Sequence, residues 1–251
     1  MVHFVGAGCG APDLITLRGK ALLEAADVII YAGSLVNPAL LDYAKPGCEI
    51  HDSARLTLPE VIALIEAAEQ KGMTTVRLHT GDPCVYGAIR EQMDALDARR
   101  IAYDICPGVS AFCGAAASLR AEYTLPEVSQ TVILTRMAGR TPVPERESIR
   151  ALAAHRSTMV IFLSTGMLEA LSAELIAGGY PAETPAAIVY KASWPDEIVL
   201  RCTVVTLAET AAAHGITKTA LITVGDFLGD DYALSKLYDA QFSTGFREAK
   251  P

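Results

Sequence analysis

The sequence predicts an α/β protein with two α/β domains, and three observations support this fold class. Short apolar stretches typical of strands alternate with segments whose apolar residues recur every three or four positions, as in helices. Turns rich in glycine and proline join many of these segments. One stretch, Met137–Glu147, combines two prolines, a glycine and several charges. We therefore expect an N-terminal α/β domain over residues 1–136, a linker over 137–147, and a C-terminal α/β domain with a tail over 148–251.

The N-terminal half has the pattern of repeated β-α units. After a strand at Val2–Val5, apolar spacing predicts a helix over Leu14–Ala26, and "DVIIY" (Asp27–Tyr31) is nearly all apolar, as in a strand covered on both faces. Thr57 and Glu60 have capping-box spacing, which predicts a helix to about Gln70. The other expected elements of this half are strand Thr74–Thr80, helix Tyr86–Arg99, strand Ala102–Cys106, a helix opened by "PGVSAF", and a last strand Gln130–Arg136. Such repeats predict a mostly parallel sheet with helices on both faces.

The C-terminal half is expected to contain a mixed sheet. Its strand patterns are Thr158–Ser164, Ala186–Lys191, Glu197–Val205 and Ala220–Gly225, with helices ending near Gly178 and over Leu207–His214. No helix pattern separates the second strand from the third, so these two should form an antiparallel hairpin. The aromatic and polar tail, Asp230–Pro251, is expected to pack on the body of the protein.

Composition narrows the class of protein. The formal net charge of −8 over 251 residues disfavours nucleic acid as a partner, although a local cluster of arginines would still serve an anionic small molecule. The six cysteines form no C-x-x-C pair and lie near no histidine at metal-ligand spacing, so we expect reduced, buried thiols and no metal site. No signal-peptide pattern and no apolar run of about 20 residues is present, so we expect a soluble cytoplasmic protein with no membrane partner.

A first candidate site is the glycine-rich turn after the first strand, "VGAGCGAPDLIT". Gly6, Gly8 and Ala11 fit the loose G-x-G-x-x-G/A fingerprint of dinucleotide-binding folds. However, no acidic residue ends the second strand, and Pro12 occupies the turn where amide donors are needed. These departures disfavour NAD or FAD, and a tight turn without any ligand remains the alternative.

Two further strand ends carry turns of small residues, at Thr80-Gly81-Asp82-Pro83 and at Pro107-Gly108-Val109-Ser110. Asp82 would either cap the next helix or face a ligand hydroxyl or ammonium group. Ser110 would be either a helix N-cap or a ligand contact. Since open α/β sheets bind ligands at the carboxyl ends of their strands, three such turns in one domain favour a shared ligand surface.

The order and spacing of these motifs resemble those of the tetrapyrrole (class III) S-adenosylmethionine methyltransferases, over essentially the whole chain. The motifs are Val5–Gly10, Thr80–Pro83, Pro107–Ala111 and Leu221–Gly225. A longer set is similar to one branch of that family, the precorrin-4 and cobalt-precorrin-4 C11-methyltransferases of cobalamin biosynthesis. It comprises Asp27–Val36, His79–Met93, Gln130–Glu145, Val189–Glu197 and Ser235–Arg247.

The resemblance implies the tetrapyrrole methylase fold, with S-adenosyl-L-methionine held between two domains and S-adenosyl-L-homocysteine as product. The positions that match the family's cofactor contacts are Cys9, Thr80, Gly81, Asp82, Val85, Ser110, Ala111, Leu163, Tyr190, Ala192 and Ala220. Where the family often has G-P-G-D-P, this chain has Cys9 and Ala11, so the first loop is expected to act through backbone and shape. Cys9 itself would be a packing residue or a cofactor contact. The family also implies a homodimer.

The implied reaction moves a methyl group from the sulfonium to C11 of precorrin-4 or cobalt-precorrin-4, a step for which the protein needs positioning rather than a nucleophile of its own. No catalytic residue is assigned, and the histidines suggest none. Because precorrins carry many carboxylates, Arg136 and Arg140 are candidate substrate contacts, with Ser53 and Arg55 as weaker ones; solvated surface charges are the alternative. The competing functions are methylation of another precorrin carbon, a diphthine-type protein methylase, a non-catalytic nucleotide or tetrapyrrole binder, and a dehydrogenase.

Overall fold

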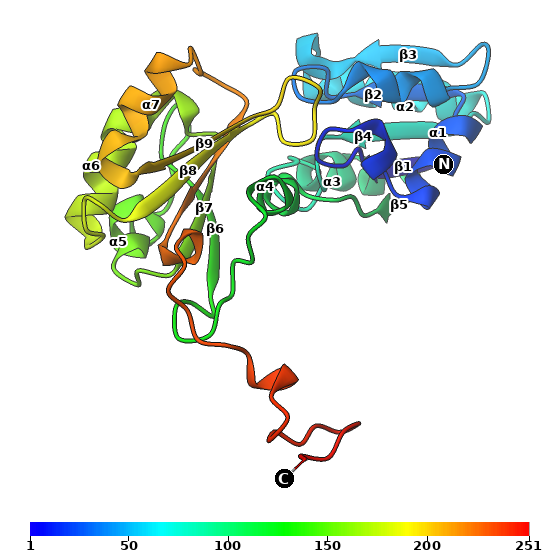
Figure 1. The fold of residues 1–251 in the computed structure, drawn as a ribbon. Helices are drawn as coiled ribbons and strands as arrows, with labels where there is room; N and C mark the ends of the chain where they lie inside the picture. The colour runs from blue at the N-terminus through cyan, green and yellow to red at the C-terminus, as the bar shows by residue number, and fades with distance from the viewer. Residues whose placement is uncertain (251) are drawn as a thin grey trace. The chain divides into compact units, whose positions relative to one another are not determined.

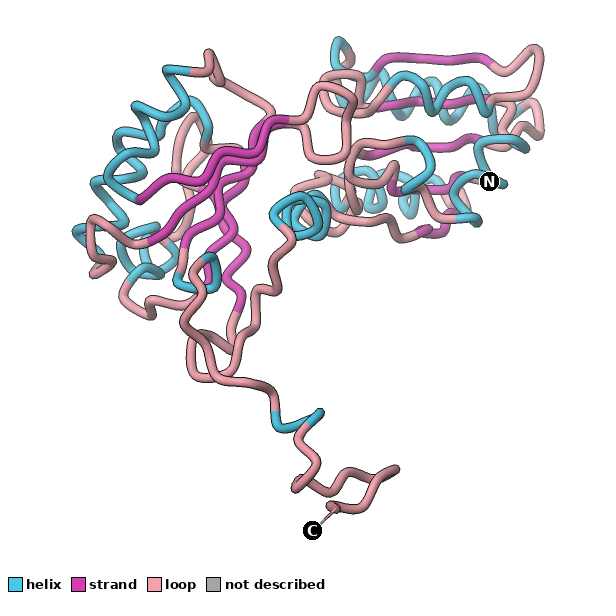
Figure 2. The backbone as a smooth tube through the Cα atoms, viewed as in Figure 1, coloured by secondary structure: helices cyan, strands magenta, loops and turns pink. Residues whose placement is uncertain are grey.

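The computed structural model describes residues 1–250 and divides the chain into two α/β units (Figure 1). Unit 1 comprises Met1–Ala115 together with Lys191–Glu197, and unit 2 comprises Ala116–Tyr190 and the described chain from Ile198 onward. Strands and helices alternate along most of the chain, as Figure 2 shows. No described helix is long and apolar enough to cross a membrane.

Unit 1 is built on a parallel sheet with the strand order β3-β2-β4-β1-β5. Its strands are β1 (Val2–Gly6), β2 (Val28–Tyr31), β3 (Glu49–Asp52), β4 (Thr75–His79) and β5 (Tyr103–Cys106). Its helices are α1 (Leu17–Ala25), α2 (Leu58–Gln70) and α3 (Arg90–Arg99), and α4 (Ala111–Leu119) contains the boundary to unit 2. The parallel sheet expected for the N-terminal half is therefore confirmed.

The core of unit 1 lies on both faces of this sheet. Val5 and Ile29 belong to one buried cluster, whereas their chain neighbours Phe4 and Ile30 belong to another. Consecutive strand residues point to opposite faces, so this alternation shows that both faces are covered. The burial explains why "DVIIY" is apolar throughout.

Unit 2 has a mixed sheet with the order β6-β7-β10-β8-β9. Its strands are β6 (Val132–Arg136), β7 (Thr158–Phe162), β8 (Pro185–Tyr190), β9 (Ile198–Thr203) and β10 (Ala220–Val224). The β6–β7 pair is parallel, and the β8–β9 pair is the expected antiparallel hairpin. The helices α5 (Ile149–Ala153), α6 (Leu168–Gly178) and α7 (Leu207–Ala213) cover one face (Figure 1).

The strand expected to end the N-terminal half belongs to unit 2 instead. Ile133 pairs with Met159 and Leu134 with Val160, so β6 forms the edge of the second sheet. The stretch 137–147, expected as a linker, therefore connects two elements of unit 2. Proline and glycine mark it as a loop, but such a composition does not reveal whether a loop joins domains or lies within one.

Two helices of unit 1 begin later than their apolar pattern predicts. Residues Pro12–Leu14 form a separate 3-10 turn, and the Thr16 hydroxyl accepts a hydrogen bond from the Gly19 amide at 3.0 Å, so α1 starts at Leu17. Tyr86 and Ala88 have φ angles of 57° and 50°, a left-handed conformation that no α-helix continues, so α3 starts at Arg90. The edge strand β3 was not predicted, since its sequence, Glu49–Asp52, is largely polar.

The tail does not pack on the body as expected. Leu234, Tyr238 and Phe246 are 82%, 84% and 104% exposed. Instead, the Arg247 guanidinium donates hydrogen bonds to the carbonyls of Leu237, Asp239 and Phe242, all within the tail. The tail therefore folds on itself over the described residues.

Candidate functional site

Three strand-end turns of unit 1 pack backbone against backbone. They follow β1, β4 and β5, which are neighbours in the sheet. A Cβ atom built on Gly108 would lie 2.2 Å from the carbonyl oxygen of Gly81 and 2.7 Å from Cα of Gly6. A Cβ on Gly6 would lie 2.6 Å from Gly108 in turn. These glycines are required because no side chain fits between the turns.

The Asp82 carboxylate joins two of these turns. One oxygen accepts a hydrogen bond from the Cys84 amide at 2.8 Å, and the other accepts one from the Gly108 amide at 2.8 Å. Desolvation acts to raise the pKa of Asp82, but the hydrogen bonds from Cys84 and Gly108 outweigh it and hold the pKa below its ordinary value. Asp82 does not cap the next helix, because α3 begins at Arg90. It remains half-buried, and each carboxylate oxygen retains a lone pair for a ligand.

The first loop is held by the segment Lys191–Glu197, which belongs to the same unit. Gly8 forms a two-way backbone bridge with Gly81. The Ser193 hydroxyl accepts a hydrogen bond from the Ala11 amide at 2.9 Å, and a Cβ on Gly10 would lie 2.3 Å from the Trp194 ring. The shape of the first loop is therefore fixed by Gly81 on one side and by Ser193 and Trp194 on the other.

Cys9 lies inside this packing rather than on an open surface. Its side chain is buried, its Sγ atom lies 3.6 Å from the Ser193 hydroxyl, and a Cβ on Gly114 would lie 2.8 Å from the same sulfur. The expectation of buried thiols holds for Cys9 and Cys106 only, because Cys84 and Cys113 are exposed and Cys48 and Cys202 are half-buried. Desolvation raises the pKa of Cys113 and raises that of Cys202 to about 11, which disfavours the thiolate at both positions. Among residues 1–250, no group of three or more His, Cys, Asp or Glu side chains is placed to hold a metal ion.

Most predicted cofactor residues lie around the joined turns of unit 1. They are Cys9, Thr80, Gly81, Asp82, Val85, Ser110, Ala111 and Ala192. Ser110 occupies the N-cap position of α4, where its carbonyl accepts the Gly114 amide at 3.3 Å. Ala192 belongs to the segment that packs on the first loop, and its carbonyl faces Gly10. The sequence motifs thus converge in the structure.

The predicted residues of unit 2 gather at one end of its sheet. Tyr190 and Ala220 are directly paired across β8 and β10, and Leu163 directly follows β7, the other neighbour of β10. Leu163 is 61% exposed and has a φ of 54°, a left-handed conformation that is uncommon for residues other than glycine. Arg136 is the last residue of β6 and pairs with Phe162, the residue before Leu163, so it lies at the same end of the sheet.

The two arginines of unit 2 differ in their surroundings. The Arg136 guanidinium donates hydrogen bonds to the carbonyls of Met137, Thr141 and Pro142, so it also shapes the loop that follows β6. Arg140 is exposed on that loop.

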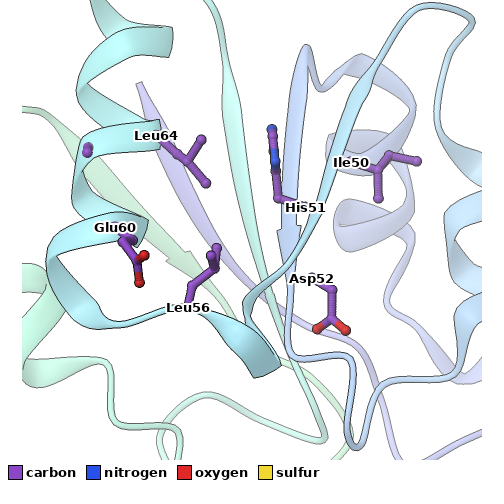
Figure 3. Close-up of a pocket in the computed structure, with 7 residues that line it drawn as sticks. Ile50, His51, Asp52, Leu56, Glu60 and Leu64 are labelled. Atoms are coloured by element: carbon purple, nitrogen blue, oxygen red, sulfur yellow. The ribbon is translucent and has the colours of Figure 1, made fainter.

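Two hollows lie near the ends of β2, β3 and β4 in unit 1. An open groove of about 550 Å³ is bordered by Ile50, His51 and Asp52 of β3 and by residues of and before α2 (Figure 3). The two carboxylates of this groove already accept hydrogen bonds within the protein. Asp52 accepts them from the Gly33 and Ala54 amides, and Glu60 accepts one from the Thr57 amide in the capping box of α2. A second cavity, of about 260 Å³, is lined by Ser53 and Thr80. Ser53 also donates a hydrogen bond to the Tyr31 carbonyl at 3.0 Å.

Sequence reasoning missed several residues of these sites. Ser193 and Trp194 lie in the stretch "VYKASWPDE", yet nothing in that stretch showed that Ser193 would bind Ala11 of the first loop, 182 residues earlier. Arg77 and His79 alternate with Val76 and Leu78, a pattern typical of a strand with one exposed face, so nothing in the sequence showed that all of β4 would be buried.

Comparison with known proteins agrees with this fold and arrangement. A family model of tetrapyrrole (corrin/porphyrin) methylases matches residues 1–208, and the chain belongs to this family. A relative from Methanocaldococcus jannaschii, named cobalt-precorrin-4 C(11)-methyltransferase, is 54% identical over 99% of this chain and 96% of its own. The crystal structure of a cobalamin biosynthetic cobalt-precorrin-4 methyltransferase is 44% identical and covers 91% of this chain and 96% of its own, with a TM-score of 0.89. Uroporphyrin-III C-methyltransferase from Thermus thermophilus, solved with S-adenosylhomocysteine, is 26% identical with a TM-score of 0.73, over 90% of this chain and 92% of its own.

Proposed function

We propose that this protein transfers a methyl group from S-adenosyl-L-methionine to C11 of precorrin-4 or cobalt-precorrin-4, releasing S-adenosyl-L-homocysteine. The observation that carries the proposal is the 54% identity, over 99% of the chain, to a protein named for this reaction. The 31% identity to an enzyme named for uroporphyrinogen-III is much lower, which favours precorrin-4 over the substrate of that relative.

The joined turns of unit 1 suit a nucleoside that carries no phosphate. The glycine backbones leave no room for side chains, and the turn at Thr80–Asp82 offers a hydroxyl and a carboxylate beside them. A carboxylate of lowered pKa is anionic at neutral pH, so it suits ribose hydroxyls or an ammonium group and repels a phosphate. We propose that this site includes Cys9, Thr80, Gly81, Asp82, Val85, Ser110, Ala111 and Ala192. Leu163, Tyr190 and Ala220 of unit 2 are proposed as further contacts of the methyl donor.

The residues of the chain act in this reaction by binding and orienting. The bound donor supplies a methyl group on a positively charged sulfur, which needs no enzyme nucleophile. Fixing two reactants in an attack geometry supplies about 7–11 kcal/mol of a barrier. The rigid turns, tied by Asp82 and Ser193, are suited to that task.

Substrate carboxylates and the assembly complete the proposal. Arg136 and Arg140 would meet carboxylates of the tetrapyrrole, with Ser53 as a further contact; Arg guanidinium groups suit carboxylates because of their planar donor geometry.

The enzyme is proposed to act in the cytoplasm as a homodimer. Light scattering during gel filtration measures the mass of the assembly, and a mass of one chain would contradict the dimer.

The decisive experiment incubates purified protein with labelled S-adenosylmethionine and either precorrin-4 or cobalt-precorrin-4, then locates the methyl group by NMR. Label at C11 is expected, and the ratio of the two rates shows which form of the substrate is used. Label at another ring carbon would support the alternative methylase, and no transfer together with no S-adenosylhomocysteine binding would overturn the proposal.

A further inference from the structure

A buried arginine without a counter-ion lines the 260 Å³ cavity of unit 1. Arg77 lies in β4 and is 6% exposed. Its Nε atom donates to the Gln92 side chain at 2.9 Å and its Nη1 atom donates to the Ile30 carbonyl at 2.9 Å. Both partners are neutral, and no carboxylate of the described chain lies within 4.0 Å of its guanidinium.

The charge of Arg77 is retained despite this burial. Burial lowers the pKa of Arg77 to about 10, which leaves the guanidinium protonated at neutral pH. Burial, and secondly the charge of Arg77, lower the pKa of His79 to about 3, so the neighbouring imidazole is neutral and its Nε2 atom has no hydrogen-bond partner. Buried charges in proteins are ordinarily paired, so an unpaired one beside a cavity indicates an anionic ligand.

The lining of the cavity suits an oxygen-rich anion of limited size. Ser53, Thr80 and Tyr86 line it beside Arg77, at the carboxyl end of the parallel sheet where such folds bind ligands. The Ser53 and Thr80 hydroxyls already donate to the Tyr31 and Leu35 carbonyls, so an anion in the cavity would be held by the Arg77 guanidinium. Glu91 also lines it but makes no ion pair with Arg77. The cavity volume of about 260 Å³ is enough for a short carboxylate arm and too small for a whole tetrapyrrole.

We propose that this cavity binds one carboxylate arm of the tetrapyrrole, with Arg77 as the cation that receives it. This inference rests on the proposed function, because it takes the ligand to be a polycarboxylate tetrapyrrole. It adds a binding site in unit 1 to the arginines proposed in unit 2. Arg77 uses two of its five N–H groups internally, which leaves Nη2 donors for the carboxylate.

Uroporphyrin III, a stable tetrapyrrole with carboxylate arms, is the probe in calorimetric titrations of the intact chain. Arg77→Gln removes the charge and is expected to weaken binding about 10- to 100-fold, whereas Arg77→Lys should recover part of it. Arg90→Gln is the matched control, since Arg90 is exposed and pairs only with Asp94 on α3. S-adenosylhomocysteine affinity should stay within twofold in all three variants, which also shows that they fold.

A second measurement uses the wild-type protein and so does not depend on how the variants fold. The Nε–H resonance of Arg77 should shift when uroporphyrin III is added, and also, more weakly, with propionate. An unshifted resonance, or unchanged uroporphyrin affinity in a folded Arg77→Gln variant, would overturn the inference. Methyl transfer to precorrin-4 by the wild type is measured separately. Its absence would refute the proposed function, whereas the two binding measurements would still show whether the cavity binds a carboxylate arm.

Discussion

At the scale of single residues, Asp82 shows how a side chain can serve the fold and a ligand together. Its carboxylate holds the turns after β4 and β5 at a fixed distance through the Cys84 and Gly108 amides. The sequence left open whether it capped a helix or faced a ligand, because both roles use the same residue in a Gly-Asp-Pro turn. Only the pairing of β1 with β5 brings Gly108 to it.

Replacing Asp82 with asparagine should destabilise unit 1 by about 1–3 kcal/mol, because one amide loses its acceptor. The pKa of Asp82 is depressed in the folded state, so its stabilisation is complete above the unfolded-state value, about 3.9. That stabilisation is lost as the pH falls through the lower folded value. Urea unfolding of both proteins from pH 7 to pH 3 measures this, and a difference in stability that stays constant with pH would contradict it.

Gly108→Ala tests the contact between the three turns. The added methyl group would meet the Gly81 carbonyl oxygen at 2.2 Å, so the turns must separate, with an expected loss of at least about 2 kcal/mol and weaker S-adenosylhomocysteine binding. Gly166→Ala is the control: its nearest neighbouring atom would be 3.8 Å away and its φ is ordinary. Urea unfolding and calorimetry compare the two, and equal effects would contradict the role assigned to Gly108.

At the scale of elements, the segment Lys191–Glu197 connects two strands of the second sheet yet is part of unit 1. It is internally braced: Lys191 pairs with Asp196 at 2.5 Å, and the Ser193 amide donates to the Glu197 carboxylate at 2.5 Å. The sequence predicted the β8–β9 hairpin, because no helix pattern separates the two strand patterns and this can be seen in the stretch between them. It could not predict what the connecting segment contacts, because that depends on packing between distant segments.

Ser193→Ala removes the acceptor of the Ala11 amide and loosens the first loop. We expect S-adenosylhomocysteine affinity to fall about 3- to 10-fold, consistent with the loss of one hydrogen bond, while kcat changes less than KM for the methyl donor. Ser235→Ala, in the exposed tail, is the control and should leave both unchanged. A fall in kcat alone would contradict a role in holding the loop.

At the scale of the whole molecule, the sequence predicted the two α/β halves and the parallel and mixed sheets, because burial sets the apolar pattern of each strand. It assigned β6 to the wrong half, since an apolar strand pairs equally well with either sheet until its neighbour is known. The sequence also predicted that Thr80, Asp82 and Ser110 lie close together, because the carboxyl ends of parallel strands meet at one edge of the sheet. Arg77 was missed because its significance depends on a cavity.

Removing residues 234–251 should change the free energy of unfolding by less than about 0.5 kcal/mol. The described tail is exposed and bonds mainly within itself; Ala233, which donates to the Pro126 carbonyl, is retained. Thermal unfolding of the truncated and full chains, followed by circular dichroism, checks this. A large loss of stability would show that the tail supports the fold, and a change in mass on gel filtration would assign it to assembly.

The packing of Trp194 on Gly10 has a practical consequence. Trp194 is the only tryptophan among the 251 residues, and its ring lies against the loop proposed to approach the methyl donor, with the Lys191 ammonium 5.2 Å from the ring centroid. Indole emission depends on nearby charge and on solvent contact. The unlabelled protein therefore carries its own optical reporter at the first loop, and rapid-mixing fluorescence can time the arrival of the donor and the departure of the product.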